Sequence, residues 1–158
     1  MSVVALSAFN STPYLTLLFK KNFNLWKGRI DELLICLHSG NKEIDDCNET
    51  ILKDDKIRIW KYEKFNELGR ALDFIYPYAK GDVLMTIDSD NFIFNGRKLE
   101  EFINYIKDDK FDAVGSPGNS GGPASVVDFM GKKMGFVRLN SFMSFWNKKK
   151  IDSLGEMS

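Results

Sequence analysis

Short apolar runs that alternate with amphipathic segments are the feature that most restricts how this chain can fold. The run at residues 83–87 is rich in β-forming side chains, and polar residues on both sides limit it to the length of a buried strand. The segment before it repeats apolar residues at helical spacing, at Leu68, Leu72, Ile75 and Ala79. Strands that alternate with helices predict an α/β fold, with a mostly parallel central sheet and helices on both faces.

The other elements are predicted from the same patterns. We expect strands at residues 3–6, 33–37, 57–62, 111–114 and 134–139, with residues 142–146 extending the last strand or pairing beside it. The strand at 57–62 alternates in polarity and is expected near an edge. Helices are expected over residues 99–106 and after Ser11-Thr12-Pro13, which offers a hydroxyl cap and a proline at the first helical position. The stretch from residue 41 to Asp55 is too weakly patterned to assign.

Residues 115–124 contain four glycines and two prolines, a composition that predicts a loop. Such a loop either closes over a ligand as a mobile lid or serves as a plain connector. The glycine spacing matches no phosphate-binding loop, and between the lid and the connector we prefer the connector.

Composition limits the function as well as the fold. The 158 residues suffice for one domain with a core, so we expect a single domain over residues 1–158. The 22 basic and 22 acidic residues cancel, which argues against nucleic acid as a partner. Cys36 and Cys47 have neither metal-ligand spacing nor a disulfide framework. We therefore expect a reducing, cytoplasmic setting.

The sequence predicts no signal peptide and no transmembrane segment, because no apolar stretch approaches the roughly 20 residues that a bilayer requires. The tail around Phe142, Phe145 and Trp146, followed by residues 148–150, mixes aromatic and cationic side chains and is a candidate for peripheral contact with the inner face of a membrane. An ordinary core strand followed by a solvated charge run explains the same residues, and we prefer that interpretation.

Two carboxylates, Asp88 and Asp90, follow the strand at residues 83–87. Carboxylates at the C-terminal end of a parallel strand lie where open α/β sheets bind ligands, and such a pair suits Mn²⁺ or Mg²⁺ together with phosphate oxygens. The pattern by itself occurs at about the frequency expected by chance. On spacing alone we would prefer the simpler interpretation, in which both residues cap the following turn.

Three blocks of the sequence reverse that preference. They are an opening strand, residues 3–10, that ends at Asn10, then Asn66-Glu67-Leu68-Gly69-Arg70-Ala71 leading a helix, and then residues 78–90. With these blocks in this order, the chain resembles the family 2 glycosyltransferases of the GT-A fold. The resemblance implies transfer of a sugar from a nucleotide-diphosphate donor, most commonly a UDP-sugar, to a glycan, lipid-linked or protein acceptor. It also implies a metal held by Asp88 and Asp90, with Asp90 as the principal ligand and Asp88 nearer the nucleotide.

The same resemblance assigns further binding residues. It implies that the nucleotide base lies against Ala8, Phe9, Ser39 and Gly40. It implies that the phosphates meet Lys64 or Arg70. Members of the family commonly carry an acidic residue at the end of the second strand, where this chain has His38-Ser39-Gly40. That histidine either donates to a uracil carbonyl or a phosphate or is structural, and a lone histidine at a strand end is more often structural.

The chain departs from the family pattern a second time. The resemblance implies an acidic pair that acts as general base and deprotonates the acceptor, and we find no such pair in the sequence. Asp152 and Glu156 are candidates only by default. We therefore divide the domain into a donor-binding part, residues 1–95, and an acceptor-side part, residues 96–158, that is expected to be incomplete. Two alternatives stay open: a noncatalytic or truncated nucleotide-binding module, and a phosphatase of the haloacid dehalogenase type with Asp88 as nucleophile. The phosphatase is disfavoured because that family carries the motif on its first strand.

Overall fold

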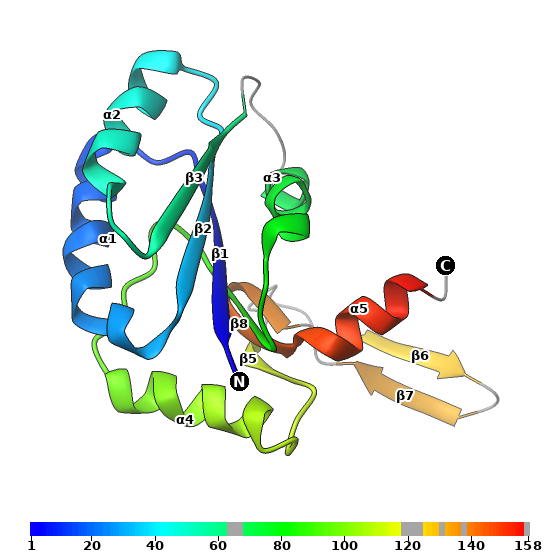
Figure 1. The fold of residues 1–158 in the computed structure, drawn as a ribbon. Coiled ribbons are helices and arrows are strands. Elements are labelled where there is room, and N and C mark those ends of the chain that lie inside the picture. Colours follow the sequence, from blue (N-terminus) through cyan, green and yellow to red (C-terminus); the bar gives the residue numbers. More distant parts are fainter. Residues whose placement is uncertain (63–67, 118–124, 130–131, 137–138, 157–158) are drawn as a thin grey trace.

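The computed structural model describes residues 1–62, 68–117, 125–129, 132–136 and 139–156. A six-stranded sheet forms its centre, in the order β3-β2-β1-β4-β8-β5 (Figure 1). The strands are β1 (Val3–Phe9), β2 (Glu32–Leu37), β3 (Ile57–Lys61), β4 (Val83–Ile87), β5 (Ala113–Pro117) and β8 (Leu139–Asn147). Strands β3, β2, β1 and β4 pair in parallel, whereas β8 runs antiparallel to both β4 and β5. The predicted mostly parallel α/β fold is confirmed.

Helices cover both faces of the sheet, as predicted (Figure 1). On one face lie α1 (Pro13–Trp26), α2 (Lys42–Leu52) and α4 (Gly96–Lys107), and on the other lie α3 (Leu68–Ile75) and α5 (Lys148–Glu156). Short 3₁₀ turns follow α1 at Lys27–Arg29 and α3 at Tyr76–Tyr78. Each face has its own core, because the side chains of a strand alternate between the two faces. Every residue of β1 is buried, as expected of a strand covered on both sides.

Helix α1 is held to the sheet by aromatic packing. The rings of Phe9 and Phe19 meet edge to face at 4.9 Å, as do those of Phe23 and Trp26. Pro13 occupies the start of the helix as predicted, but the predicted hydroxyl cap is wrong, because the side chain of Thr12 makes no capping bond. Ser11, which precedes this start, instead shares a hydrogen bond with Ser89 in the turn after β4.

Helix α2 lies in the stretch that we left unassigned. Asn41 caps it, with its side-chain oxygen accepting from the backbone N–H groups of Glu43 and Ile44 at 2.9 and 3.2 Å. Two of its buried residues are polar, Asp45 and Asn48. Because polar residues occupy buried positions, the helix lacks the apolar periodicity from which it could have been predicted.

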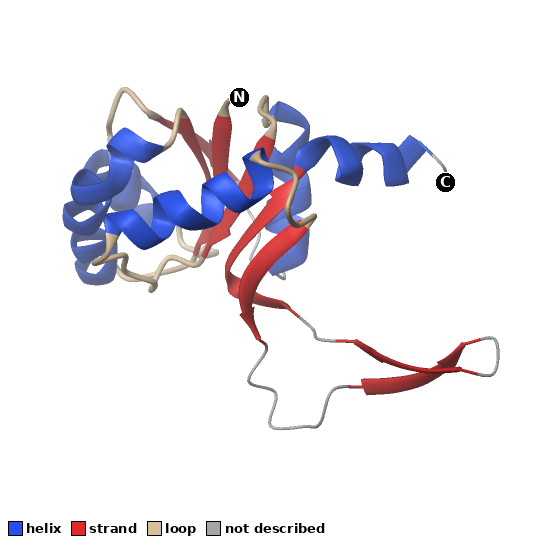
Figure 2. Ribbon diagram, turned by 90° about the horizontal axis from the view of Figure 1, so that it is seen from below, coloured by secondary structure: helices blue, strands red, loops and turns tan. Residues whose placement is uncertain are grey.

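The second half of the chain departs further from the predicted boundaries. Strand β5 runs to Pro117, so residues 115–117 are strand and not loop, whereas residues 118–124 of the predicted loop lie outside the described residues. Strands β6 (Ser125–Phe129) and β7 (Lys132–Phe136) form an antiparallel hairpin that projects away from the central sheet (Figure 2). The predicted strand 134–139 therefore spans the end of β7 and the start of β8, and its residues 137–138 are not described.

The tail strand belongs to the core. Phe145 on β8 is 1% exposed, between Met85 on β4 and Val114 on β5. Ser144 on the same strand shares a 2.5 Å hydrogen bond with the Thr86 hydroxyl. These contacts agree with our preferred interpretation of a core strand, not a membrane contact, for this segment. None of the helices in the described part of the chain has the length and apolar character needed to span a membrane.

Candidate functional site

The two carboxylates predicted from the sequence lie on a tight turn directly after β4. The backbone N–H of Asn91 donates to the carbonyl of Asp88 at 3.1 Å, which closes the turn. Strand β4 is fixed just before it, because the Ser7 hydroxyl donates to the Ile87 carbonyl at 2.6 Å. Asp88 is half-buried at the strand end, whereas Asp90 is exposed. The site therefore pairs one partly desolvated carboxylate with one in solvent.

Burial and the neighbouring charge both act on Asp88. Burial, and secondarily repulsion from Asp90, raise the pKa of Asp88 to about 6. A cation placed between the two carboxylates would relieve both penalties, so this pair fits a divalent ion electrostatically. Among the described residues, no group of three or more His, Cys, Asp or Glu side chains is arranged to hold a metal ion. A site with two carboxylates therefore needs water or ligand oxygens to complete it, as Mg²⁺ sites commonly do.

The residue between the two carboxylates anchors the turn. Ser89 is buried, and its hydroxyl shares a short hydrogen bond with the hydroxyl of Ser11. The side-chain amide of Asn48, on α2, donates to the Ser11 carbonyl at 2.9 Å. The Asp88 turn is thus connected to the β1–α1 loop and to α2. Sequence reasoning missed all three residues, since none of them carries the expected chemistry.

The strand order places this turn at a particular point of the sheet. The chain moves from β1 to β2 to β3 in one direction and then returns to add β4 on the other side of β1. In open α/β sheets, such a reversal of strand order at the C-terminal strand ends is where ligands commonly bind. The two strands at the reversal are β1, which ends at Phe9, and β4, which ends at Ile87 directly before Asp88.

The residues expected around the nucleotide base are partly brought together. Ala8 and Phe9 lie beside the end of β2, from which Ser39 and Gly40 follow. Phe9 is 0% exposed as a whole residue: its ring lies against Phe19, and its carbonyl accepts from the backbone N–H of His38 at 2.9 Å. Gly40 is exposed and has a φ of 76°, a conformation that L side chains rarely adopt.

The remaining predicted residues are spread more widely. His38 is 2% exposed, so its side chain lies beneath the surface at the end of β2. Arg70 is exposed on α3. Lys64 lies outside the described residues.

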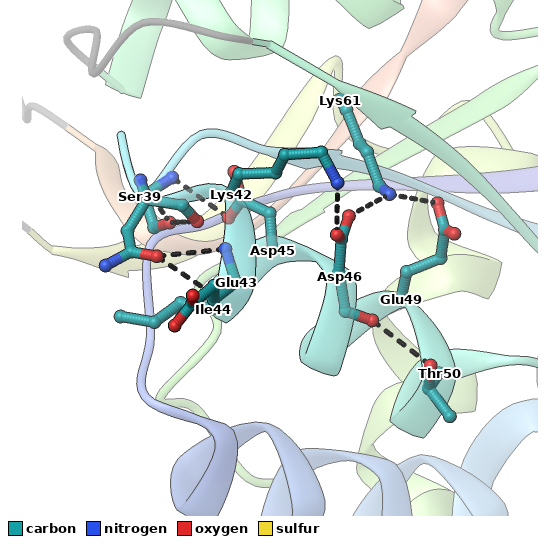
Figure 3. Close-up of polar contacts among 10 residues, drawn as sticks. Ser39, Lys42, Glu43, Ile44, Asp45, Asp46, Glu49, Thr50 and Lys61 are labelled. Atoms are coloured by element: carbon teal, nitrogen blue, oxygen red, sulfur yellow. Dashed lines mark hydrogen bonds and ion pairs between the residues drawn. The ribbon is translucent and has the colours of Figure 1, made fainter.

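A cavity of about 360 Å³ opens next to the Ser39–Gly40 corner, between α2 and the end of β3. It is lined by Asn41, Lys42, Asp45, Asp46, Lys61 and Tyr62. Asp45 is 6% exposed, and its carboxylate accepts from the backbone N–H of Ser39 at 3.2 Å (Figure 3). The carboxylate of the neighbouring Asp46 forms ion pairs with Lys42 and with Lys61, the latter at 2.6 Å (Figure 3). Sequence reasoning missed this cavity because it left residues 41–55 unassigned.

The default candidates for a general base are not brought to the Asp88 turn. Asp152 lies on α5, after β8 has run antiparallel back to the start of β4. Its carboxylate accepts from the Tyr76 hydroxyl at 2.5 Å and from the Lys148 ammonium at 2.7 Å. The length of β4, about 16 Å at 3.3 Å per residue, therefore separates Asp152 from Asp88. Of the Glu156 side chain nothing is described.

Comparison with known families decides the classification. The family model described as glycosyl transferase family 2 matches residues 3–153. This chain belongs to glycosyl transferase family 2. No curated protein sequence matches it. The resemblance of the three sequence blocks to this family is confirmed.

Solved structures share the fold of this family 2 chain at low sequence identity. The mannosyltransferase PcManGT from Pyrobaculum calidifontis, in complex with GDP-Man and Mn²⁺, is 11% identical with a TM-score of 0.71, and the match covers 97% of this chain and 46% of that one. TarS from S. aureus in complex with UDP-GlcNAc is 16% identical with a TM-score of 0.64, over 98% of this chain and 48% of that one. The chain thus spans about half the length of these two glycosyltransferases.

A third solved structure is a 4-diphosphocytidyl-2C-methyl-D-erythritol synthase from Anaerococcus prevotii. It is 16% identical with a TM-score of 0.63, over 99% of this chain and 75% of that one. These likenesses establish the GT-A fold of this family 2 member, and at such identities they establish the fold alone.

Proposed function

We propose that this chain binds a nucleoside-diphosphate sugar at the C-terminal strand ends beside β4 and takes part in transfer of the sugar to an acceptor hydroxyl. The observation that carries the proposal is the Asp88–Asp90 pair on the C-terminal end of β4, at the reversal of strand order. Family membership supports the same reading, and so do the neighbours solved with GDP-Man and UDP-GlcNAc. A UDP-sugar or a GDP-sugar is the donor class that we expect.

We further propose that Asp90 is the principal ligand of Mn²⁺ or Mg²⁺ and that Asp88, the more buried of the two, faces the nucleotide. The bound ion would supply charge neutralisation for the departing diphosphate. The protein would orient that end of the donor through Ser89, whose hydrogen bond with Ser11 holds the turn in place. Arg70, on α3, and Lys64 are proposed to meet the phosphates.

The base is proposed to lie over the ends of β1 and β2, against Ala8, Phe9, Ser39 and Gly40. Two strand spacings separate β2 from β4, which is about 10 Å and comparable with the distance from a base to its β-phosphate. The cavity beside Asp45 continues this line. Its lining carries two cations and two carboxylates, a balance that suits a neutral heterocycle better than a phosphate.

The Asp45 carboxylate gives this end of the site a specific chemistry. One oxygen accepts from Ser39, and the remaining lone pairs can only accept further hydrogen bonds. We propose that Asp45 accepts the ring N–H of uracil or guanine and so replaces the acidic residue that the family commonly has at the end of the second strand. Tyr62 lines the same cavity and would give the base an apolar wall.

The acceptor class, whether glycan, lipid-linked molecule or protein, is proposed only as carrying a hydroxyl group. Cys36 is buried and Cys47 exposed, both as free thiols, which supports a reducing, cytoplasmic location. A second candidate function is donor binding without transfer, favoured by the position of Asp152 at the far end of β4.

Isothermal titration with UDP and GDP, with and without Mn²⁺, tests the proposed function. We expect metal-dependent binding that falls at least about tenfold in Asp90→Ala, the loss typical of one charge-assisted ligand contact. Asp73→Ala, an exposed carboxylate on α3, is the matched control. Absence of binding, or an equal affinity in Asp90→Ala, would contradict the metal–diphosphate site. Release of UDP or GDP from a nucleotide sugar in the presence of acceptor extract would separate transfer from binding alone.

A further inference from the structure

An apolar groove of about 360 Å³ lies between α1 and the segment that follows the Asp88 turn. It is lined by Leu18, Lys21, Asn22, Leu25, Phe92 and Phe94. The Leu25 side chain is 69% exposed and that of Phe94 is 86% exposed. Large apolar side chains gathered around one groove are uncommon on a free surface and mark a site of interaction.

The fold holds this groove open through a buried amide. The Asn22 side chain donates to the carbonyl of Ile93 at 2.9 Å and accepts from its N–H at 2.8 Å. Ile93 is thereby fixed in the core, at 7% exposure, while its neighbours Phe92 and Phe94 line the groove. The exposure of the two phenylalanines is therefore set by a specific pair of hydrogen bonds and not by a loose loop.

The apolar surface continues along α1. Positions 14, 18, 21 and 25 follow one another at helical spacing and share one side of the helix. Tyr14 is 70% exposed at the beginning of this row, and Leu17 beside it is 43% exposed. The row and the groove together make one face, which we call the α1 face.

Two unpaired cations accompany the α1 face. Residues 11–30 and 91–99 contain six lysines and arginines and no acidic residue. Four of the six pair with carboxylates of other segments: Lys20 and Lys27 with Asp54, Arg29 with Glu100 and Lys98 with Glu101. Within the described residues, Lys21, which lines the groove, and Arg97, which is exposed at the start of α4, take part in no ion pair, so their charges remain free for a partner.

We propose that the α1 face docks on an anionic lipid surface, with Leu25 and Phe94 entering the boundary between headgroups and acyl chains. Lys21 and Arg97 would then lie beside lipid phosphates. A second copy of the chain suits the face less well, because a twofold contact would place the cations of both copies opposite each other. Membrane contact is thus assigned to α1, and not to the tail strand β8.

Co-sedimentation with lipid vesicles tests this assignment. We expect the chain to bind vesicles of phosphatidylcholine with about 30% phosphatidylglycerol, to bind pure phosphatidylcholine weakly, and to dissociate at high salt. Leu25→Ser should lower the partition coefficient roughly tenfold, as expected when one fully inserted leucine is lost. Lys21→Gln combined with Arg97→Gln should lower it on anionic vesicles only.

The chain offers close controls for both variants. Leu154 on α5 has the same exposure as Leu25, 69%, so Leu154→Ser should leave vesicle binding unchanged. Lys53→Gln combined with Lys80→Gln removes two exposed cations elsewhere. Failure of the unaltered chain to bind anionic vesicles, or equal losses for Leu25→Ser and Leu154→Ser, would overturn the proposal. So would a dimer in solution that Leu25→Ser converts to monomer, since the face would then be an interface between copies.

Discussion

Asp88 is half-buried beside a second carboxylate, so its ionised form is less stable than that of an ordinary aspartate. In the unfolded chain the group titrates near 3.8, whereas in the folded protein its pKa is about 6. Between these values the folded state binds more protons than the unfolded state, so the free energy of unfolding falls as the pH rises. The cost is absent below about pH 3.8 and complete above about pH 6. A site arranged for a cation is thus a source of instability in its absence.

Asp88→Asn should accordingly stabilise the metal-free protein. We expect a gain of about 1 kcal/mol near pH 8, after allowance for solvent screening of a half-exposed group, and little gain near pH 4.5. Urea unfolding at both values measures it, with Asp73→Asn as the exposed control on α3. A gain that does not change with pH would show that repulsion at Asp88 is not its origin.

Asp45 allows a test of base recognition that does not depend on loss of function alone. In Asp45→Asn the side-chain carbonyl can still accept from Ser39, but the amide then presents a donor to the cavity where the carboxylate presented an acceptor. Affinity for UDP and GDP should fall roughly 10-fold to 100-fold, while affinity for CDP and ADP, whose bases carry a ring acceptor, should rise.

Titration of the four nucleotides with Mn²⁺ gives the preference of each variant. Glu43→Gln is the control, because it changes an exposed carboxylate in the first turn of the same helix. A uniform loss for all four nucleotides would mean that Asp45 only supports the loop. No binding of any nucleotide to the unaltered chain would instead disprove the donor site itself.

At the scale of the elements, helix α1 is joined to the segment after the Asp88 turn by a single polar side chain, Asn22. Asn22 satisfies the N–H and C=O groups of Ile93 and also accepts from the Trp26 indole at 2.9 Å. Asn22→Ala would leave these groups buried without partners, at a cost of about 2–4 kcal/mol in the free energy of unfolding. Urea denaturation should show a lower midpoint than for Asn24→Ala, an exposed asparagine on the same helix. Similar midpoints for the two variants would contradict the role of the amide.

The elements also show why some of the fold was predictable and some was not. Strands β1, β2 and β4 were recognised as short continuous apolar runs, and helices α3 and α4 because their apolar residues recur at helical spacing. Helix α2 was missed because Asp45 and Asn48 are buried for their hydrogen bonds, which hydrophobic patterning does not detect. Asp88 and Asp90 could be found because their chemistry is local, whereas the cavity depends on α2 meeting the end of β3.

At the scale of the whole molecule, the two proposed surfaces are joined by one short segment. The chain leaves the Asp88 turn, passes Phe92 and Phe94 along α1, and then enters α4. A lipid surface on the α1 face would therefore bear on the segment that begins at the proposed donor site. The sequence could not predict this arrangement, because Phe92 and Phe94 look like ordinary core residues. Only the hydrogen bonds between Asn22 and the backbone of Ile93 show that Ile93 is the one held in the core.

The position of β8 has a consequence for synthesis of the protein. On its outer side strand β4 pairs with β8, whose residues follow about 60 positions later. At 5–20 residues per second a ribosome needs about 3–12 s to make that stretch. Throughout this interval the first four strands can assemble, but β4 presents an apolar edge with unpaired backbone groups. The nascent chain is thus open to strand addition by other chains at the element that carries Asp88, and prompt arrival of β8 or shielding by a chaperone protects it.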